Sequence, residues 1–180
     1  MGGGAGRRGS RLTVRVPRFR RAAWLLPAAL AVHVAEEAPG FARWTRRNAW
    51  EGYSDRDFAR INAAGLALTV AATLVVTRTH NRTAFLAYHV GMVSQQALWN
   101  PVFHVGATAA YREYSPGVVS GVALFPATWL VLTRAAIREG RITRRATALS
   151  AALAAPVHAA AVVTQVYGVG CTAETRRWRR

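Results

Sequence analysis

Long apolar runs separated by short polar segments dominate this chain. After residue 21 there are five such runs, at residues 22–38, 61–77, 83–110, 116–136 and 146–170. No strand-like alternation of apolar and polar positions accompanies them, and no internal repeat is visible. Apolar runs of about 20 residues are typical of helices that cross a lipid bilayer. The pattern therefore predicts an all-α fold, a polytopic transmembrane helical bundle of about five spans.

The five runs differ in length, and this affects how each can cross a membrane. The first and second are short, since about 17 helical residues cover only about 26 Å of a hydrocarbon core near 30 Å. The third is long and contains Pro101. We expect a kink there, because the proline ring clashes with the carbonyl one turn earlier.

The charge of the chain is strongly basic and unevenly placed. There are 24 basic residues, all arginine, against 8 acidic residues. Such a balance could indicate nucleic-acid binding, but the arginines gather at the ends and between the apolar runs. Topology and anionic headgroups explain this layout better. We expect membrane lipids and no nucleic acid as partners, and the oligomeric state stays open.

The arginine distribution also predicts domain organisation and orientation. Residues 1–21 are interpreted as a disordered basic cytoplasmic tail, 22–170 as a single transmembrane helical domain, and 171–180 as a basic C-terminal tail. A cytoplasmic N-terminus places 14 arginines inside and ten outside, which favours a multi-pass protein of the cell membrane in that orientation. The terminal "TRRWRR" then lies outside, against the rule, so the side of the C-terminus stays open.

The stretch "HVAEE" brings charge to the end of the first apolar run. His33, Glu36 and Glu37 are spaced i, i+3 and i+4, so they share one helical face. A carboxylate in the membrane is costly unless it is paired, protonated, metal-bound or near water. Pro39 and Gly40 follow directly, so an alternative is that the glutamates lie in the headgroup zone.

The third run carries a polar seam. Within a sector of about 100° on a helical wheel lie six side chains, four of them polar: Phe85, His89, Val93, Gln96, Asn100 and His104. Such a seam is expected to face the bundle interior. The alternative is that these groups only form hydrogen bonds between helices.

The depth of each polar residue selects which of them can meet. The carboxyl ends of the first and third runs must emerge on the same side, because one hairpin separates them. His104 lies near that end, whereas His89 lies roughly 22 Å further along the axis. The expected constellation is therefore His33, Glu36, Glu37, Asn100 and His104. For His158, in the fifth run, we expect a core or hydrogen-bonding role.

Three short motifs also carry a family resemblance. "HVAEE" at residues 33–37 is followed by "NPVFH" at 100–104 and "YSPG" at 114–117. In this order they resemble an uncharacterised family of integral membrane proteins named after its H-x-x-E-E motif. The resemblance covers roughly residues 25–135 and implies a multi-span membrane protein, without implying a reaction.

The expected constellation contains the ligand types of a metal site. His33, Glu36 and His104 could bind one divalent metal, zinc or iron, and we expect their side chains within about 6 Å of one another. Glu37 could then act as general base and Asn100 could orient the substrate. This predicts a metal-dependent intramembrane hydrolase or lipid-modifying enzyme. Alternatives are a proton-coupled small transporter, using Glu37 and His104 as an acid–base pair, and a structural bundle without catalysis.

Overall fold

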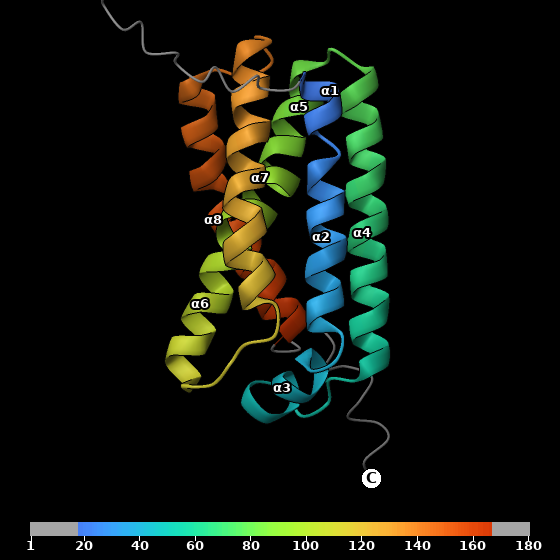
Figure 1. Ribbon diagram of the computed structural model, residues 1–180, viewed down its shortest axis with the longest axis vertical. Helices are drawn as coiled ribbons and strands as arrows, with labels where there is room; N and C mark the ends of the chain where they lie inside the picture. Colours follow the sequence, from blue (N-terminus) through green and yellow to red (C-terminus); the bar gives the residue numbers. More distant parts are fainter. Residues whose placement is uncertain (1–17, 167–180) are drawn as a thin grey trace, which may run out of the picture.

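Every regular element of the described chain is a helix. The computed structural model describes residues 18–166. The elements in chain order are α1 (Phe19–Ala22), α2 (Leu25–Glu37), α3 (Phe41–Asn48), α4 (Asp55–Arg78), α5 (Arg82–Tyr88), the π-helical stretch η1 (His89–Trp99), α6 (Asn100–Tyr111), α7 (Val118–Arg138) and α8 (Arg144–Val166). The long helices run side by side along the long axis, and α3 lies at one end of the bundle (Figure 1). The prediction of an all-α fold is confirmed.

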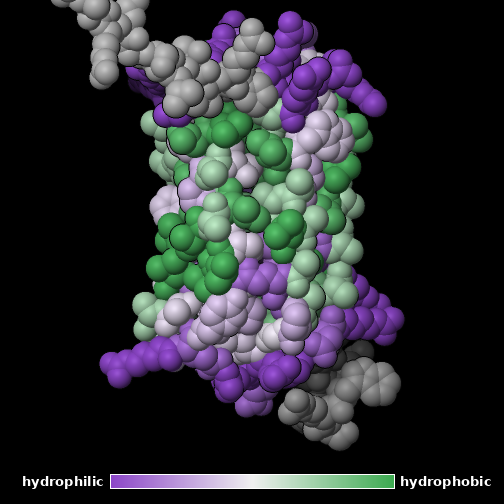
Figure 2. Space-filling model, in the orientation of Figure 1, coloured by the Kyte–Doolittle hydropathy of each residue, from purple (hydrophilic) through white to green (hydrophobic). Residues whose placement is uncertain are grey.

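Three of the helices in residues 18–166 are long and apolar enough to cross a membrane, namely α4, α7 and α8. Figure 2 shows the matching surface, an apolar belt around the middle of the visible face with polar residues gathered at both ends. The other two predicted spans are helical but interrupted. The first is divided into α1 and α2, and the third into α5, η1 and α6. The structure thus supports a membrane bundle, with three clear spans rather than five.

The second span is longer than its apolar run. Helix α4 has 24 residues, so the expectation of a short second span was wrong. The helix begins six residues before the apolar run because Ser54 and Asp57 form a capping box. Each side chain accepts from the other residue's backbone N–H, which satisfies two amides that the first turn leaves unpaired.

The third span changes its helical register before Pro101. In η1 the backbone bonds five residues back, and the N–H of Asn100 still donates to the carbonyl of Gln95. Pro101 follows within the first turn of α6, where a missing N–H costs little. The interruption therefore lies at the position where the proline predicted a kink, and it takes the form of a π-helix ending at the proline.

The chain direction brings two helix ends together. The carboxyl ends of α2 and α6 lie at the end of the bundle that α3 occupies, and α7 begins there (Figure 1). Helix α7 packs against both α2 and α6. This confirms that the ends of the first and third spans share one side.

The predicted N-terminal tail overlaps the described chain only at its end. Residues 19–21 belong to α1, where Phe19 is buried and its backbone N–H donates to Glu139 at 2.7 Å. Residues 1–17 and the predicted tail at 171–180 lie outside the described residues.

Candidate metal centre

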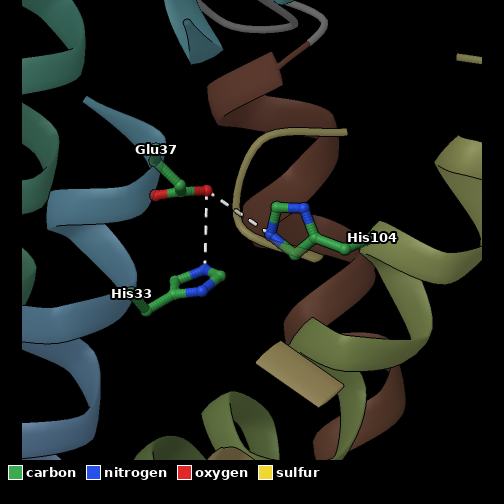
Figure 3. Close-up of side chains that lie close together, drawn as sticks. All are labelled: His33, Glu37 and His104. Carbon is green, nitrogen blue, oxygen red and sulfur yellow. Dashed lines mark ion pairs between the residues drawn. The ribbon is translucent and has the colours of Figure 1, made fainter. Parts of the chain in front are cut away.

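Three buried side chains converge at the end of the bundle where α2 and α6 stop. His33 and Glu37 lie one turn apart on α2, and His104 lies on α6. Glu37 Oε1 is 3.5 Å from His33 Nε2 and 3.4 Å from His104 Nε2. Both rings thus present one nitrogen to the same carboxylate oxygen (Figure 3). All three side chains are almost fully buried, with at most 7 % exposed.

A serine holds each imidazole from its other side. His33 Nδ1 lies 2.9 Å from Ser120 Oγ, and His104 Nδ1 lies 2.9 Å from Ser115 Oγ. Both serines are buried. Metal-binding histidines almost always have such a partner on the second nitrogen, because it fixes the ring and the tautomer.

The hydrogen bonds of Ser120 favour one tautomer of His33. The Ser120 hydroxyl lies 3.4 Å from the carbonyl of Gly117, and when it donates there its oxygen accepts from His33 Nδ1–H. The neutral ring then has a lone pair on Nε2. That buried atom faces the Glu37 carboxylate and has no hydrogen-bond partner. Two acceptors face each other, an arrangement that a cation between them would stabilise.

The neighbouring Glu36 has a different position. Its carboxylate accepts from the backbone N–H groups of Gly117 at 3.2 Å, Val119 at 3.1 Å and Ser120 at 2.6 Å. It also accepts from the Tyr114 hydroxyl, and this hydrogen bond raises the pKa of Tyr114 to about 12. Glu36 therefore caps the amino terminus of α7 from another helix, where the helix dipole favours a negative charge.

The segment "YSPG" closes the site between α6 and α7. Gly117 has a φ of 100°, in the left-handed region, and it precedes the first turn of α7. A Cβ at this position would lie 2.6 Å from His33 Cε1, 2.8 Å from His104 Cε1 and 2.9 Å from Glu37 Cγ. Only glycine fits here, because the backbone conformation and the space both exclude a side chain.

The predicted site residues are brought together in part. His33 and His104 meet as expected, and the carboxylate between them is that of Glu37, not Glu36. Asn100 lines the adjacent cavity. His89 lies apart from the group, as expected from its depth, and contacts Thr133 Oγ1 at 3.2 Å and Ser94 Oγ at 3.3 Å. His158 has the expected hydrogen-bonding role, with Gln95 as its partner.

Sequence reasoning missed three residues of the site, Ser115, Gly117 and Ser120. Two of them, Ser115 and Gly117, lie in the "YSPG" motif, so the sequence did carry a signal for them. A serine and a glycine in a short turn after "NPVFH" are suited to support a side chain and to allow close approach. What the sequence lacked was the position of this turn relative to α2.

Aromatic side chains cover the site at the end of the bundle. The Phe41 ring of α3 lies 6.2 Å from that of His104, and it stacks on Trp44 at 5.9 Å. A cavity of about 90 Å³ adjoins the three residues on another side. Its walls come from α2, α3, α4, η1, α6 and α8 and from Tyr53. The site therefore faces an internal cavity, while aromatic rings separate it from the end of the bundle.

The geometry of the three residues suits a metal ion. Their ligand atoms all lie within 4.8 Å of one another. Two nitrogen or oxygen ligands held about 2.0–2.2 Å from one tetrahedral ion are separated by roughly 3.3–3.6 Å. The two measured separations from Glu37 Oε1, 3.4 and 3.5 Å, agree with this value. His33, Glu37 and His104 could thus hold one metal ion.

The comparison with known families identifies the motif that includes His33 and Glu37. Residues 24–131, more than half of the chain, match the family described as proteins of unknown function with an HXXEE motif. The chain belongs to this family. No curated protein and no solved structure matches the chain. In this HXXEE protein the three motif residues divide between two tasks, since His33 and Glu37 face His104 whereas Glu36 caps α7.

Proposed function

We propose that this HXXEE protein is a metal-dependent membrane hydrolase with one divalent ion held by His33 Nε2, Glu37 and His104 Nε2. The observation that carries the proposal is the pair of facing acceptors, His33 Nε2 and the Glu37 carboxylate, with a second imidazole directed at the same oxygen. Two histidines and one carboxylate are the protein ligands of several hydrolytic zinc sites. The same set also suits non-haem iron, so the identity of the metal is part of the test.

In this proposal each residue has a defined task. A bound zinc ion would supply Lewis-acid activation of water for hydrolysis. Glu37 then acts as a ligand rather than as the general base, and Glu36 is left to the structure of α7. Ser115 and Ser120 orient the imidazoles. Asn100, on the cavity wall, is placed to orient the substrate.

The proposal includes five passes through the membrane. The helical path α1–α2 and the path α5–η1–α6 would cross beside α4, α7 and α8. Of the two interruptions, η1 packs against α7 and α8, and cover by neighbouring helices is the condition for irregular helix in a membrane. The site would then lie near one membrane face.

A second candidate, a proton relay, has one observation in its favour. Glu37 lies between two imidazoles at nearly equal distances, so a proton could bridge the same atoms that a metal would bridge. In a proton-coupled transporter the three residues would exchange protons and bind no metal. Metal content therefore distinguishes the two candidates.

The test is elemental analysis of protein purified in detergent without added chelator. We expect about one equivalent of zinc or iron in the wild type and less than a tenth of that in Glu37→Gln and His104→Ala. Ser115→Ala should weaken metal binding about 10–100-fold, because the His104 ring loses its support.

Two variants serve as matched controls. Glu36→Gln should keep the metal, since Glu36 faces α7. Comparing it with Glu37→Gln shows which of the two adjacent carboxylates binds the metal. His89→Ala removes another buried histidine and should also keep the metal. Wild-type protein without stoichiometric metal, or a metal lost in Glu36→Gln and retained in Glu37→Gln, would contradict the proposal.

A further inference from the structure

The cavity beside the three residues contains polar atoms that lack partners within the protein. Gln95 Oε1, Asn100 Oδ1 and His158 Nε2 are buried without a hydrogen bond. All three residues line the same cavity, from η1, α6 and α8 respectively. A buried polar atom without a partner is costly, and most such atoms in folded proteins are paired. Three of them around one cavity indicate a polar ligand.

The hydrogen bonds of these residues define what that ligand must offer. Gln95 Nε2 donates to His158 Nδ1 at 3.1 Å, so the neutral His158 has its proton on Nε2 and presents a donor. Asn100 Nδ2 donates to Gln96 Oε1 at 3.2 Å, which leaves its own carbonyl oxygen as an acceptor. The cavity thus offers two carbonyl acceptors and one donor. Hydroxyl groups, which both donate and accept, complement this set.

The charge of the cavity excludes one common class of lipid headgroup. The described residues that line it include no arginine, although the chain contains 24 basic residues, all arginine. Its lining carboxylate is Glu37. Phosphate recognition relies largely on arginine or lysine side chains, which the described lining of this cavity lacks. An uncharged headgroup fits these walls.

The route into the cavity points to the membrane. Partly exposed residues of α4 (Ile61, Asn62 and Gly65) and of α8 (Ala161, Val162 and Gln165) form one side of it. These are two of the helices with membrane-spanning length and composition. At the end of the bundle, by contrast, Phe41 and Trp44 are buried over the site. The partly exposed lining residues thus include these six on α4 and α8, whereas aromatic rings cover the end of the bundle.

From these observations we propose that the cavity binds an uncharged membrane lipid with a hydroxylated head, which enters between α4 and α8. The hydroxyl donates to Asn100 Oδ1 and accepts from His158 Nε2, and the acyl chains extend past Ile61 and Val162 into the bilayer. The idea that this lipid is the substrate of the centre rests on the proposed hydrolase function. The idea that the lipid binds in the cavity depends only on the residues that line the cavity.

The experiment uses full-length protein in phosphatidylcholine nanodiscs with a photoactivatable diacylglycerol whose diazirine lies near the headgroup. Crosslinks should map to residues 61–65 of α4 and 161–165 of α8. Unlabelled dioleoylglycerol should compete at least about tenfold better than dioleoyl phosphatidic acid, which has the same chains and an anionic head. Equal competition by phosphatidic acid, or crosslinks elsewhere only, would overturn the proposal.

Variants test the polar contacts. In Asn100→Leu and in His158→Leu, the concentration of dioleoylglycerol needed to compete with the probe should rise about fivefold or more. The reason is that the lipid hydroxyl loses a partner in a buried site. Thr77→Val is the matched control, on α4 away from the cavity, since its hydroxyl bonds to its own helix at Thr73. Asn62→Arg should reverse the preference in favour of phosphatidic acid. Unchanged competition in both leucine variants would exclude a role for these groups.

Metal content is measured in the same samples, so the two proposals can fail separately. The leucine variants should keep the metal of the wild type, and wild-type protein treated with EDTA should still bind diacylglycerol. Diacylglycerol binding by wild-type protein that contains no stoichiometric metal when purified without chelator would sustain this inference and end the hydrolase proposal. Stoichiometric metal in a protein that does not bind diacylglycerol selectively would support the metal centre and overturn the lipid site.

Discussion

Gly117 shows how closely the backbone approaches the three residues of the centre. The place where a side chain of this residue would begin is filled by the side chains of His33, Glu37 and His104. Its carbonyl accepts from Ser120, and its N–H donates to Glu36. One residue thus contacts both halves of the "HVAEE" stretch, which makes the site sensitive to a single methyl group.

We therefore expect Gly117→Ala to damage both stability and metal binding. The left-handed backbone alone costs about 1–2 kcal/mol with alanine, and the clash with both imidazoles adds to that cost. The expected results are a lower thermal unfolding temperature in detergent and a metal content below half of wild type. Gly106→Ala on α6 is the control, because no atom lies within 4 Å of its Cβ position. Equal behaviour of the two variants would show that the packing around Gly117 is unimportant.

At the scale of the elements, α2 and α7 are joined through a single carboxylate. The amino terminus of α7 has Gly117 as its N-cap residue, and no side chain from within that helix caps it. Glu36 supplies the missing acceptor from α2 and binds three of the first amides. This contact links the end of α2 to the first turn of α7.

Replacing Glu36 by glutamine should loosen this junction while the fold is retained. The amide lacks the negative charge and has one acceptor oxygen in place of two, so we expect a loss of about 1–3 kcal/mol in the free energy of unfolding. Reversible unfolding in mixed micelles provides the measurement.

Glu113→Gln is the control for a surface carboxylate, since Glu113 pairs with the exposed Arg47. Such pairs contribute about 0–1 kcal/mol, so this variant should unfold close to wild type. If Glu36→Gln and Glu113→Gln have the same small effect, Glu36 does not hold α7 in place.

At the scale of the whole molecule, the candidate site belongs to one end of the bundle. Helix α3, the carboxyl ends of α2 and α6, and the start of α7 all lie there (Figure 1). The opposite end is held by Arg141, which donates to the carbonyls of Val76 and Thr79 and lies over the ring of Phe19. The orientation of the protein therefore decides which membrane face the centre serves.

The arginine distribution leads us to propose that the α3 end faces outward. In a Cys171→Ser background, we expect Glu51→Cys, in the exposed turn before α4, to react with an impermeant maleimide on intact cells. Arg138→Cys, exposed at the end of α7, should react only after lysis. The opposite pattern would reverse the orientation and place the centre on the cytoplasmic face.

The sequence alone determined that the apolar runs are helical and that two distant motifs meet. Apolar runs must be helical in a bilayer, and helix rise converts sequence position into depth, so His33 had to meet His104 rather than His89. These conclusions depend only on local geometry. They needed no knowledge of how the helices are rotated.

Only the tertiary structure decided which glutamate faces the histidines. Glu36 and Glu37 are neighbours in the sequence, but about 100° of helical rotation separates their side chains. The rotation of α2 is set by its packing on α4 and α7. The segment from Ser115 to Ser120 supplies the amides and hydroxyls that Glu36 and the two imidazoles meet. These are contacts between residues about 80 apart in the chain, so no local pattern in "HVAEE" could have assigned the two carboxylates.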